Sequence, residues 1–168
     1  ARELQSHGIS VDVFEKSRGP SGRMSTRRTQ DWSADHGAQY FTARDPRFIQ
    51  EVQSWIQAGT AATWKPKLKV YEAKTWRESH SQDIRYVGTP HMNSPGKHLA
   101  EGLSIQYERT ISRLESRNKK WHLLCNEVNE ITTQYDFVVL AIPAPQARAL
   151  LEGLDSKAAD IADSAQMR

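Results

Sequence analysis

Residues 9–28 constrain the fold of this chain more than any other segment. Apolar and polar residues alternate from Ile9 to Val13, which is typical of a short β-strand. The carboxylate of Glu15 follows directly, and then a loop rich in glycine and arginine over residues 18–28. A carboxylate in this place can hold ribose hydroxyls, while a basic loop with an open backbone can lie against a pyrophosphate. The order therefore predicts a nucleotide-binding α/β fold.

The composition favours a globular protein with a local anionic ligand. The 168 residues are 38% hydrophobic and 26% charged, and the formal net charge is only +3. Basic residues concentrate between Lys16 and Arg28, which favours a small anionic ligand over a nucleic-acid groove. The single cysteine, Cys125, excludes an internal disulfide and a cysteine-based metal site, and it fits a reducing, cytoplasmic location. No apolar run approaches the roughly eighteen residues that span a membrane.

Helix signals organise the first two thirds of the chain. Asp45 and Pro46 are typical of a helix N-terminus, because Asp caps free N–H groups and Pro fits the first turn. The apolar residues that follow share one helical face, and Gly59 ends the pattern. We further expect a helix over 1–7 closed by Gly8, a loop or an irregular helix start at 19–29, a short strand and turn within 32–42, and strands within 60–87. Ser94 as N-cap and Pro95 in the first turn predict another helix, which runs through Leu99 and Leu103.

The last third of the chain predicts a meander and then a buried strand. Antiparallel strands are expected at 105–114, 121–125 and 130–134. Residues 135–142 form the most apolar run, which is typical of a buried parallel strand. A helix closed by Gly153 and another starting at Asp155 should follow. This order predicts a Rossmann-like domain interrupted by an insertion.

A second candidate site lies at residues 35–41. Gly37 and Ala38 permit close approach to a flat ring, and Gln39 and Tyr40 offer hydrogen-bond donors. His36 can act as a base near neutral pH, although a hydrogen-bonded structural histidine is the commoner case. Each motif has a plain alternative, because a strand-end glutamate is often only solvated and a basic loop often only keeps a protein soluble. Metal-ligand spacing is absent from the other histidines, which are His7, His80, His91, His98 and His122.

Four segments together carry a resemblance to a known family. Residues 18–26 are Arg-Gly-Pro-Ser-Gly-Arg-Met-Ser-Thr, and residues 35–41 are Asp-His-Gly-Ala-Gln-Tyr-Phe. Residues 88–93 are Gly-Thr-Pro-His-Met-Asn, and residues 136–145 are Asp-Phe-Val-Val-Leu-Ala-Ile-Pro-Ala-Pro. They resemble the flavin-containing amine oxidase superfamily, and most of all its renalase-like members. The family pattern has a glycine doublet in the first segment, where this chain has Ser21 before Gly22.

The resemblance implies an α/β fold with a Rossmann-like FAD-binding domain of the glutathione-reductase type. An inserted β-meander and part of an α+β substrate domain would complete it. The implied pieces are 1–44 and 94–154 for the FAD-binding domain, and 45–93 and 155–168 for the substrate domain. The first strand and its glycine loop would lie before residue 1, so the chain resembles an internal fragment.

The resemblance also implies non-covalently bound FAD. Glu15 would bind the adenosine ribose, and Thr110 or Ile111 would face the adenine through backbone groups. The other implied cofactor-binding residues are Lys16, Arg18, Ser21, Gly22 and Arg23 toward the pyrophosphate and ribityl chain, His36, Gly37, Ala38, Gln39 and Tyr40 toward the isoalloxazine, and Ala141 and Pro143 near the exit of the last strand. Met92 and Asn93 would lie on the substrate side.

The implied activity is oxidation of dihydronicotinamide isomers of NAD(P), with hydride transfer to flavin N5 and O₂ as acceptor, giving H₂O₂. Loss of hydride restores aromaticity, so no catalytic acid or base is nominated, and no metal. A primary amine oxidase or desaturase of the same superfamily is the first alternative. A non-catalytic fragment that binds FAD weakly is the second, because it would lack the helix N-terminus that holds phosphate. A nucleic-acid binder, resting only on residues 16–28, is the third.

Overall fold

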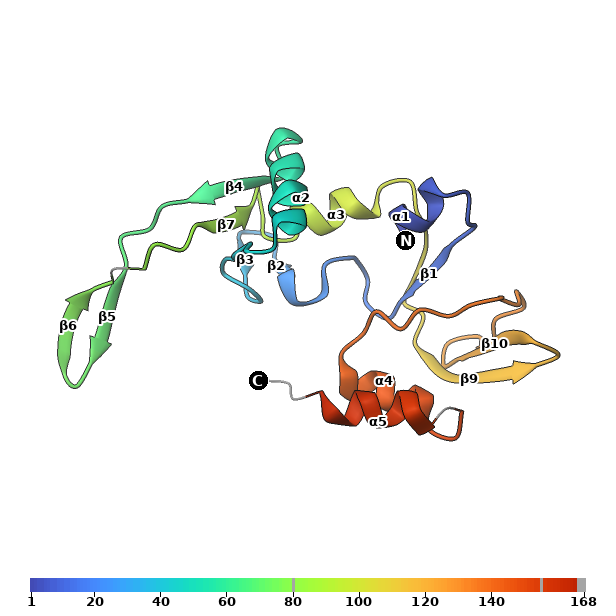
Figure 1. The fold of residues 1–168 in the computed structure, drawn as a ribbon. Helices are drawn as coiled ribbons and strands as arrows, with labels where there is room; N and C mark the ends of the chain where they lie inside the picture. The colour runs from blue at the N-terminus through green and yellow to red at the C-terminus, as the bar shows by residue number, and fades with distance from the viewer. Residues whose placement is uncertain (80, 155, 166–168) are drawn as a thin grey trace. The chain divides into compact units, whose positions relative to one another are not determined.

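The computed structural model describes residues 1–79, 81–154 and 156–165 (Figure 1). The chain divides into two compact units. The first contains residues 1–11 and 19–104, and the second contains residues 12–18 and the chain from 105 onward. Each unit has its own hydrophobic cluster, so each is described separately.

The first unit combines helices with short antiparallel strand pairs. Its helices are α1 (Arg2–Ser6), α2 (Pro46–Gln57), α3 (Ser94–Ala100) and the 3-10 turn η1 (Gly22–Met24). Its strand pairs are β2 (Thr26–Arg28) with β3 (Ser33–Asp35), β4 (Ala61–Trp64) with β7 (Arg85–Gly88), and β5 (Lys69–Glu72) with β6 (Thr75–Glu78). The segment 19–29, predicted as a loop or an irregular helix start, contains both the turn η1 and the strand β2.

Helix α2 carries the core of the first unit. Its N-terminus is as predicted, because the Asp45 carboxylate accepts a hydrogen bond from Arg47 N at 2.8 Å. Val52 and Trp55 of α2 are buried against Ala61 and Tyr86 of the β4–β7 pair. The amphipathic pattern read from the sequence is therefore confirmed.

Helix α3 differs from the prediction at both ends. Ser94 is its first residue and not its cap, and the Ser94 Oγ accepts a hydrogen bond from His91 N at 3.3 Å. The helix ends at Ala100, because Glu101 has an extended backbone and Gly102 a positive φ of 74°. Leu103 therefore lies outside the helix.

The second unit contains a small sheet, a meander and a helix pair. Strand β1 (Asp12–Glu15) pairs with β8 (Ser104–Tyr107), and β9 (Ile111–Arg117), β10 (Lys120–Cys125) and β11 (Asn129–Glu130) form an antiparallel meander. Helices α4 (Ala144–Leu151) and α5 (Ser156–Ser164) follow. The core cluster is Leu114, Leu123, Cys125 and Ile131. The predicted start of the last helix, Asp155, lies outside the described residues.

The order of the predicted meander is confirmed, but its first strand is two strands, and its third is only Asn129–Glu130 instead of 130–134. Glu108 interrupts the first strand with a φ of 53°. Glu108 N donates to Ser17 O at 3.2 Å and Arg109 N donates to Glu15 O at 3.1 Å, so this part of the chain follows the end of β1. Only from Ile111 does the backbone pair with β10.

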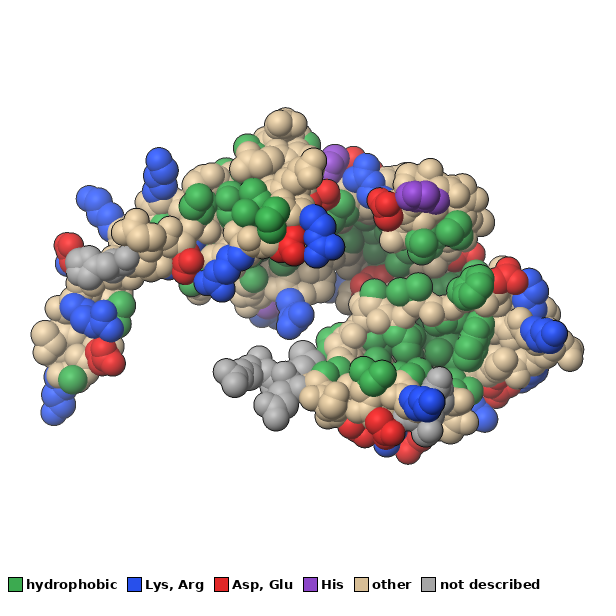
Figure 2. Space-filling model, in the orientation of Figure 1, with side chains coloured by type: hydrophobic (Ala, Val, Ile, Leu, Met, Phe, Trp, Pro, Cys, Tyr) green, Lys and Arg blue, Asp and Glu red, His purple; other side chains and the backbone are tan. Residues whose placement is uncertain are grey.

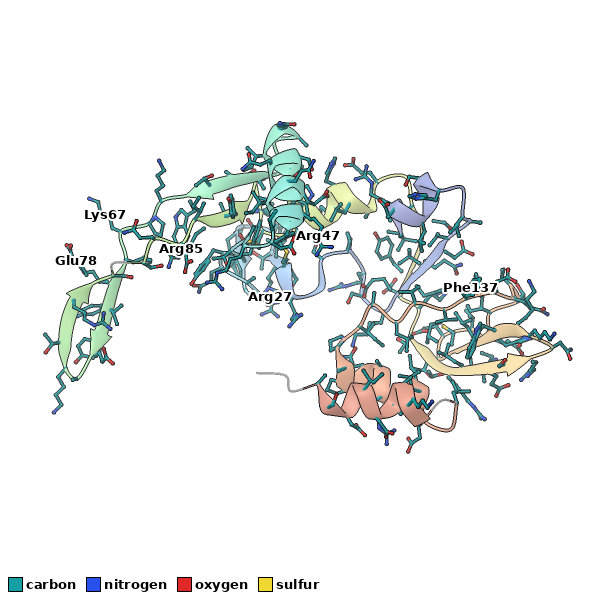
Figure 3. All side chains as sticks on the ribbon, viewed as in Figure 1. Arg27, Arg47, Lys67, Glu78, Arg85 and Phe137 are labelled. Carbon is teal, nitrogen blue, oxygen red and sulfur yellow. The ribbon has the colours of Figure 1, made fainter. Side chains whose placement is uncertain are left out.

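Residues 136–142 are not a strand, so the predicted buried parallel strand is wrong for this structure. Val138 and Leu140 pack on the core cluster of the second unit, whereas Phe137 and Val139 are 87% and 74% exposed (Figure 3). Among the described residues no backbone hydrogen bond joins 136–142 to another segment. A strand needs a hydrogen-bonded neighbour, and none is present here. The space-filling view shows apolar side chains gathered on the face of this unit (Figure 2).

No helix within the described ranges is long and apolar enough to cross a bilayer. Within the same ranges, no three His, Cys, Asp or Glu side chains are grouped so that they could share a metal ion. His80 lies outside the described residues.

Candidate nucleotide-binding site

Backbone contacts hold the predicted pyrophosphate loop against the predicted ring-binding segment. Ala38 N donates a hydrogen bond to Arg23 O at 2.8 Å. A Cβ built on Gly37 would lie 2.1 Å from the same oxygen, so only glycine fits there. The turn η1 leaves the side chain of Arg23 exposed. We call residues 21–25 with 35–38 the loop corner.

Ser21 has a backbone conformation that favours glycine, with a φ of 100°. This is the position where the family pattern has a glycine. The Ser21 Oγ donates to Asn93 O at 2.9 Å, and a Cβ on Gly96 would lie 2.2 Å from that Oγ. The hydroxyl thus ties the loop corner to the start of α3, which a glycine could not do.

Asp35 joins three segments of the first unit. Its Oδ1 accepts hydrogen bonds from Thr26 Oγ1 at 2.6 Å and from Met92 N at 3.1 Å. The carboxylate therefore fixes the β2–β3 pair against the turn before α3. Asp35 is not among the residues predicted to bind the cofactor, and its place in the 35–41 motif is the only sequence signal for this role.

The two residues predicted on the substrate side differ in their surroundings. Met92 is 1% exposed, so its side chain belongs to the interior of the first unit. Asn93 is 9% exposed, and its buried Oδ1 has no hydrogen-bond partner among the described residues. An unpaired buried polar atom costs about 1–3 kcal/mol, so a ligand donor or a water at this point would be stabilising.

The remaining residues of the ring-binding segment lie near the surface. His36 Nε2 is 3.5 Å from Ser25 Oγ, and both Gln39 and Tyr40 are exposed. The Tyr40 ring lies 5.8 Å from that of Trp64, measured between centroids. Both a structural role and a ligand-facing role for His36 agree with its exposure and with its contact to Ser25.

Glu15 ends β1 in the second unit, as predicted. Its Oε1 accepts a hydrogen bond from Ser17 N at 2.7 Å, and no hydrogen bond within the described residues uses Oε2. One carboxylate oxygen is thus engaged in a local turn and the other can accept from a ligand. The other candidates of this unit are Lys16, Arg18 and Ala141, which are exposed, and Ile111 and Pro143, which are half-buried.

The backbone of Thr110 is already occupied. Its N–H donates to Glu127 Oε2 at 2.8 Å, and its carbonyl accepts from Asn126 N at 3.0 Å. Ile111 is paired with Cys125 in the meander, and an adenine contact at either residue stays a prediction.

Glu127 is an electrostatic feature that the sequence did not indicate. Its Oε2 accepts hydrogen bonds from Cys125 Sγ at 2.9 Å and from Thr110 N. The hydrogen bond from Cys125 first, and those from Thr110 second, lower the pKa of Glu127 from 4.5 to about 2. The Glu127 carboxylate therefore joins the turn after β10 to Thr110, which lies just before β9.

This chain is similar to known nucleotide-binding proteins. Residues 1–53 match the family model described as an NAD(P)-binding Rossmann-like domain. Renalase from Mus musculus is 24% identical over 144 residues, which cover 82% of this chain and 40% of the renalase. The chain is thus similar to renalase over most of its own length. It spans about 40% of the length of the curated relative that it matches.

The resemblance to renalase and the Rossmann-like assignment are thus confirmed, and both agree with a nucleotide or flavin cofactor. Within the first unit of this renalase-like chain, the loop corner and Asn93 come together. The predicted cofactor residues of the second unit are Glu15, Lys16, Arg18, Ile111, Ala141 and Pro143. That they complete one site with the loop corner stays a prediction.

Proposed function

We propose that this chain is part of a FAD-dependent oxidoreductase that oxidises dihydronicotinamide isomers of NAD(P). The Rossmann-like match and the similarity to renalase support it. The observation that carries the proposal is the loop corner, in which an arginine-bearing turn is held against Gly37 and Ala38 by backbone contact. When bound, FAD would supply a hydride acceptor at N5 and pass the electrons to O₂, giving H₂O₂.

The residues present fit this cofactor. Arg23 is exposed and has no salt bridge within the described residues, so its guanidinium is free to pair with a phosphate. Glu15 keeps one carboxylate oxygen for a ribose hydroxyl. The unpaired Asn93 Oδ1 offers an acceptor beside the loop corner. In this proposal Arg23 and Gly22 hold the pyrophosphate, and the segment 37–40 lines the ring.

The first strand of the Rossmann sheet belongs to the proposal as well. A strand preceding residue 1 would pair with the segment 136–142, whose backbone has no described partner. A helix packed on that face of the sheet, as in Rossmann-like domains, would cover Phe137 and Val139, which are 87% and 74% exposed. The segment would then become the buried strand that its sequence predicts.

The chain's own residues have a positioning task in this reaction. A dihydronicotinamide gains aromaticity when it loses hydride, so no residue needs to remove a proton. The protein must instead hold the donor carbon over the ring, which is a matter of orientation. We therefore assign no catalytic acid or base.

The test uses the full-length, flavin-loaded protein under anaerobic conditions. Mixing it with dihydronicotinamide isomers should bleach the flavin, and admitting O₂ should restore the colour with formation of H₂O₂. Bleaching by primary amines but not by dihydronicotinamides would support the amine oxidase alternative and refute the proposal.

A further inference from the structure

The β4–β7 pair places a tryptophan and an arginine next to Tyr40. Trp64 and Arg85 are opposite each other in the register of this pair, and Figure 3 labels Arg85 on it. The Tyr40 and Trp64 rings are tilted by 43° with centroids 5.8 Å apart. The guanidinium carbon of Arg85 lies 5.2 Å from the centre of the Tyr40 ring, which is cation–π distance. We call these three side chains the aromatic ledge.

The ledge is open to solvent on its aromatic side. Tyr40 is 41% exposed and Trp64 is 39% exposed. The core aromatics of this unit, by contrast, are covered, with Tyr86 at 4% and Trp55 at 6%. These two neighbouring rings are tilted and half exposed, and each offers an aromatic surface that a planar ligand can contact.

Arg85 brings to this face a cation that has no carboxylate partner. Its Nη1 donates to Asp83 O and its Nη2 to Ser81 Oγ, both at 3.2 Å, and both acceptors are neutral. The Asp83 carboxylate is paired with Arg44 instead. No salt bridge reaches Arg85 within the described residues, and its buried Nε has no hydrogen-bond partner there.

A half-buried guanidinium that lies over an aromatic ring is stabilised by an anion that matches its planar fork. Two terminal N–H groups are used by neutral oxygens, and a guanidinium has five in all. Donors therefore remain for a phosphate oxygen, next to rings that suit a heterocycle or ribose.

We propose that the aromatic ledge of Tyr40, Trp64 and Arg85 binds the phosphate-bearing part of a nucleotide substrate and disfavours primary amines. This rests on the proposed function, because Tyr40 also belongs to the segment assigned to the flavin ring. Arg85 attracts an anionic dihydronicotinamide nucleotide and repels a protonated amine. The ledge is thus a specificity determinant and carries out no chemical step.

The experiment compares two substrates that differ only in a phosphate, the dihydronicotinamide mononucleotide and its riboside. In the full-length flavin-loaded protein, Arg85→Gln should raise KM for the mononucleotide about tenfold and leave KM for the riboside unchanged. Arg85→Lys keeps the charge without the planar fork and should lie between. The matched control is Arg77→Gln, because Arg77 is an exposed arginine of the same unit paired with Glu72. It should change neither value.

A binding measurement makes the test independent of turnover. Calorimetric titration with oxidised nicotinamide mononucleotide should show the same loss of affinity in Arg85→Gln, and titration with nicotinamide riboside should not. Equal losses for both ligands, or no loss for either, would overturn the ledge. If neither dihydronicotinamide reduces the flavin, the proposed function fails, while a phosphate-dependent loss in the titration would still uphold the ledge.

Discussion

Single backbone atoms decide the geometry of the loop corner. The position of Arg23 O requires a glycine at residue 37. Ser21 has a left-handed backbone, and the hydrogen bond from its hydroxyl to Asn93 O stabilises this conformation. In a strained position of this kind, the surrounding contacts must hold the conformation in place. The departure of Ser21 from the family glycine is therefore compatible with the loop that the family pattern predicts.

Gly37→Ala should destabilise the first unit by about 2 kcal/mol, because the new Cβ would overlap Arg23 O and force the corner apart. Denaturant unfolding of the variant and the wild type measures this difference. Gly19→Ala is the matched control in the same loop, since a Cβ there meets nothing within 4 Å. Equal stabilities of the two variants would contradict the geometry of the corner.

Glu127 gives the second unit a pH-dependent contribution to stability. Hydrogen bonds from Cys125 and Thr110 lower its folded-state pKa to about 2, below the ordinary value of 4.5. The contribution is therefore present above pH 4.5 and is lost as the pH falls toward 2. Glu127→Gln should be less stable than wild type at pH 7, and the difference in unfolding free energy should shrink as the pH is lowered from 4.5 to 3. A difference that stays constant over this range would refute the assignment.

At the scale of elements, a helix can form from local sequence signals, whereas a strand also needs a partner from elsewhere in the chain. Helix α2 forms as predicted because its cap and its apolar face are encoded within the helix itself. Segment 136–142 has an equally clear pattern but no partner, so it stays extended without a ladder. Its side chains still alternate between exposed and packed positions, as they would in a strand with one face on a core.

That alternation predicts opposite effects at neighbouring positions. In the 168-residue chain, Phe137→Ser should change stability by less than about 0.5 kcal/mol, whereas Leu140→Ala should cost about 2 kcal/mol, because only Leu140 packs on the core. In a longer protein that supplies the proposed strand and a helix over this face, Phe137→Ser should become as damaging as Leu140→Ala. Thermal unfolding of both variants in both proteins checks this. Insensitivity to Phe137→Ser in the longer protein would show that no segment covers this face.

At the scale of the whole molecule, the predicted cofactor residues are divided between two units. The loop corner lies in the first unit and Glu15 in the second. The chain spans about 40% of the matched renalase, so an activity is proposed only for the protein of which it is part.

We expect the purified 168-residue chain to bind FAD weakly or not at all. It spans about 40% of the matched renalase, so it can supply only some of the contacts that hold the cofactor in the whole protein. Flavin fluorescence and the absorbance of the gel-filtered chain measure this, with the longer protein as the positive control. A yellow chain at one flavin per molecule would contradict the expectation.

Much of this protein was accessible from sequence because it depends on neighbours along the chain. The cap at Asp45, the end of β1 at Glu15 and the meander are encoded by local residue types and periodicity. The similarity to renalase was likewise visible in short motifs, and the comparison confirms it.

Tertiary structure alone decided the rest. The bonds from Asp35 to Met92 and from Ser21 to Asn93 join residues 57 and 72 positions apart, and no local pattern encodes such pairs. Local patterns likewise do not encode the hydrogen bonds that Glu127 accepts from Cys125 and Thr110. Nor do they show that segment 136–142 has no backbone hydrogen bond to another described segment. Sequence determined which segments can form a helix, a strand or a nucleotide loop, because those preferences are local. Which of them found a partner was decided by packing, because a hydrogen bond or a buried contact needs two surfaces that the fold brings together.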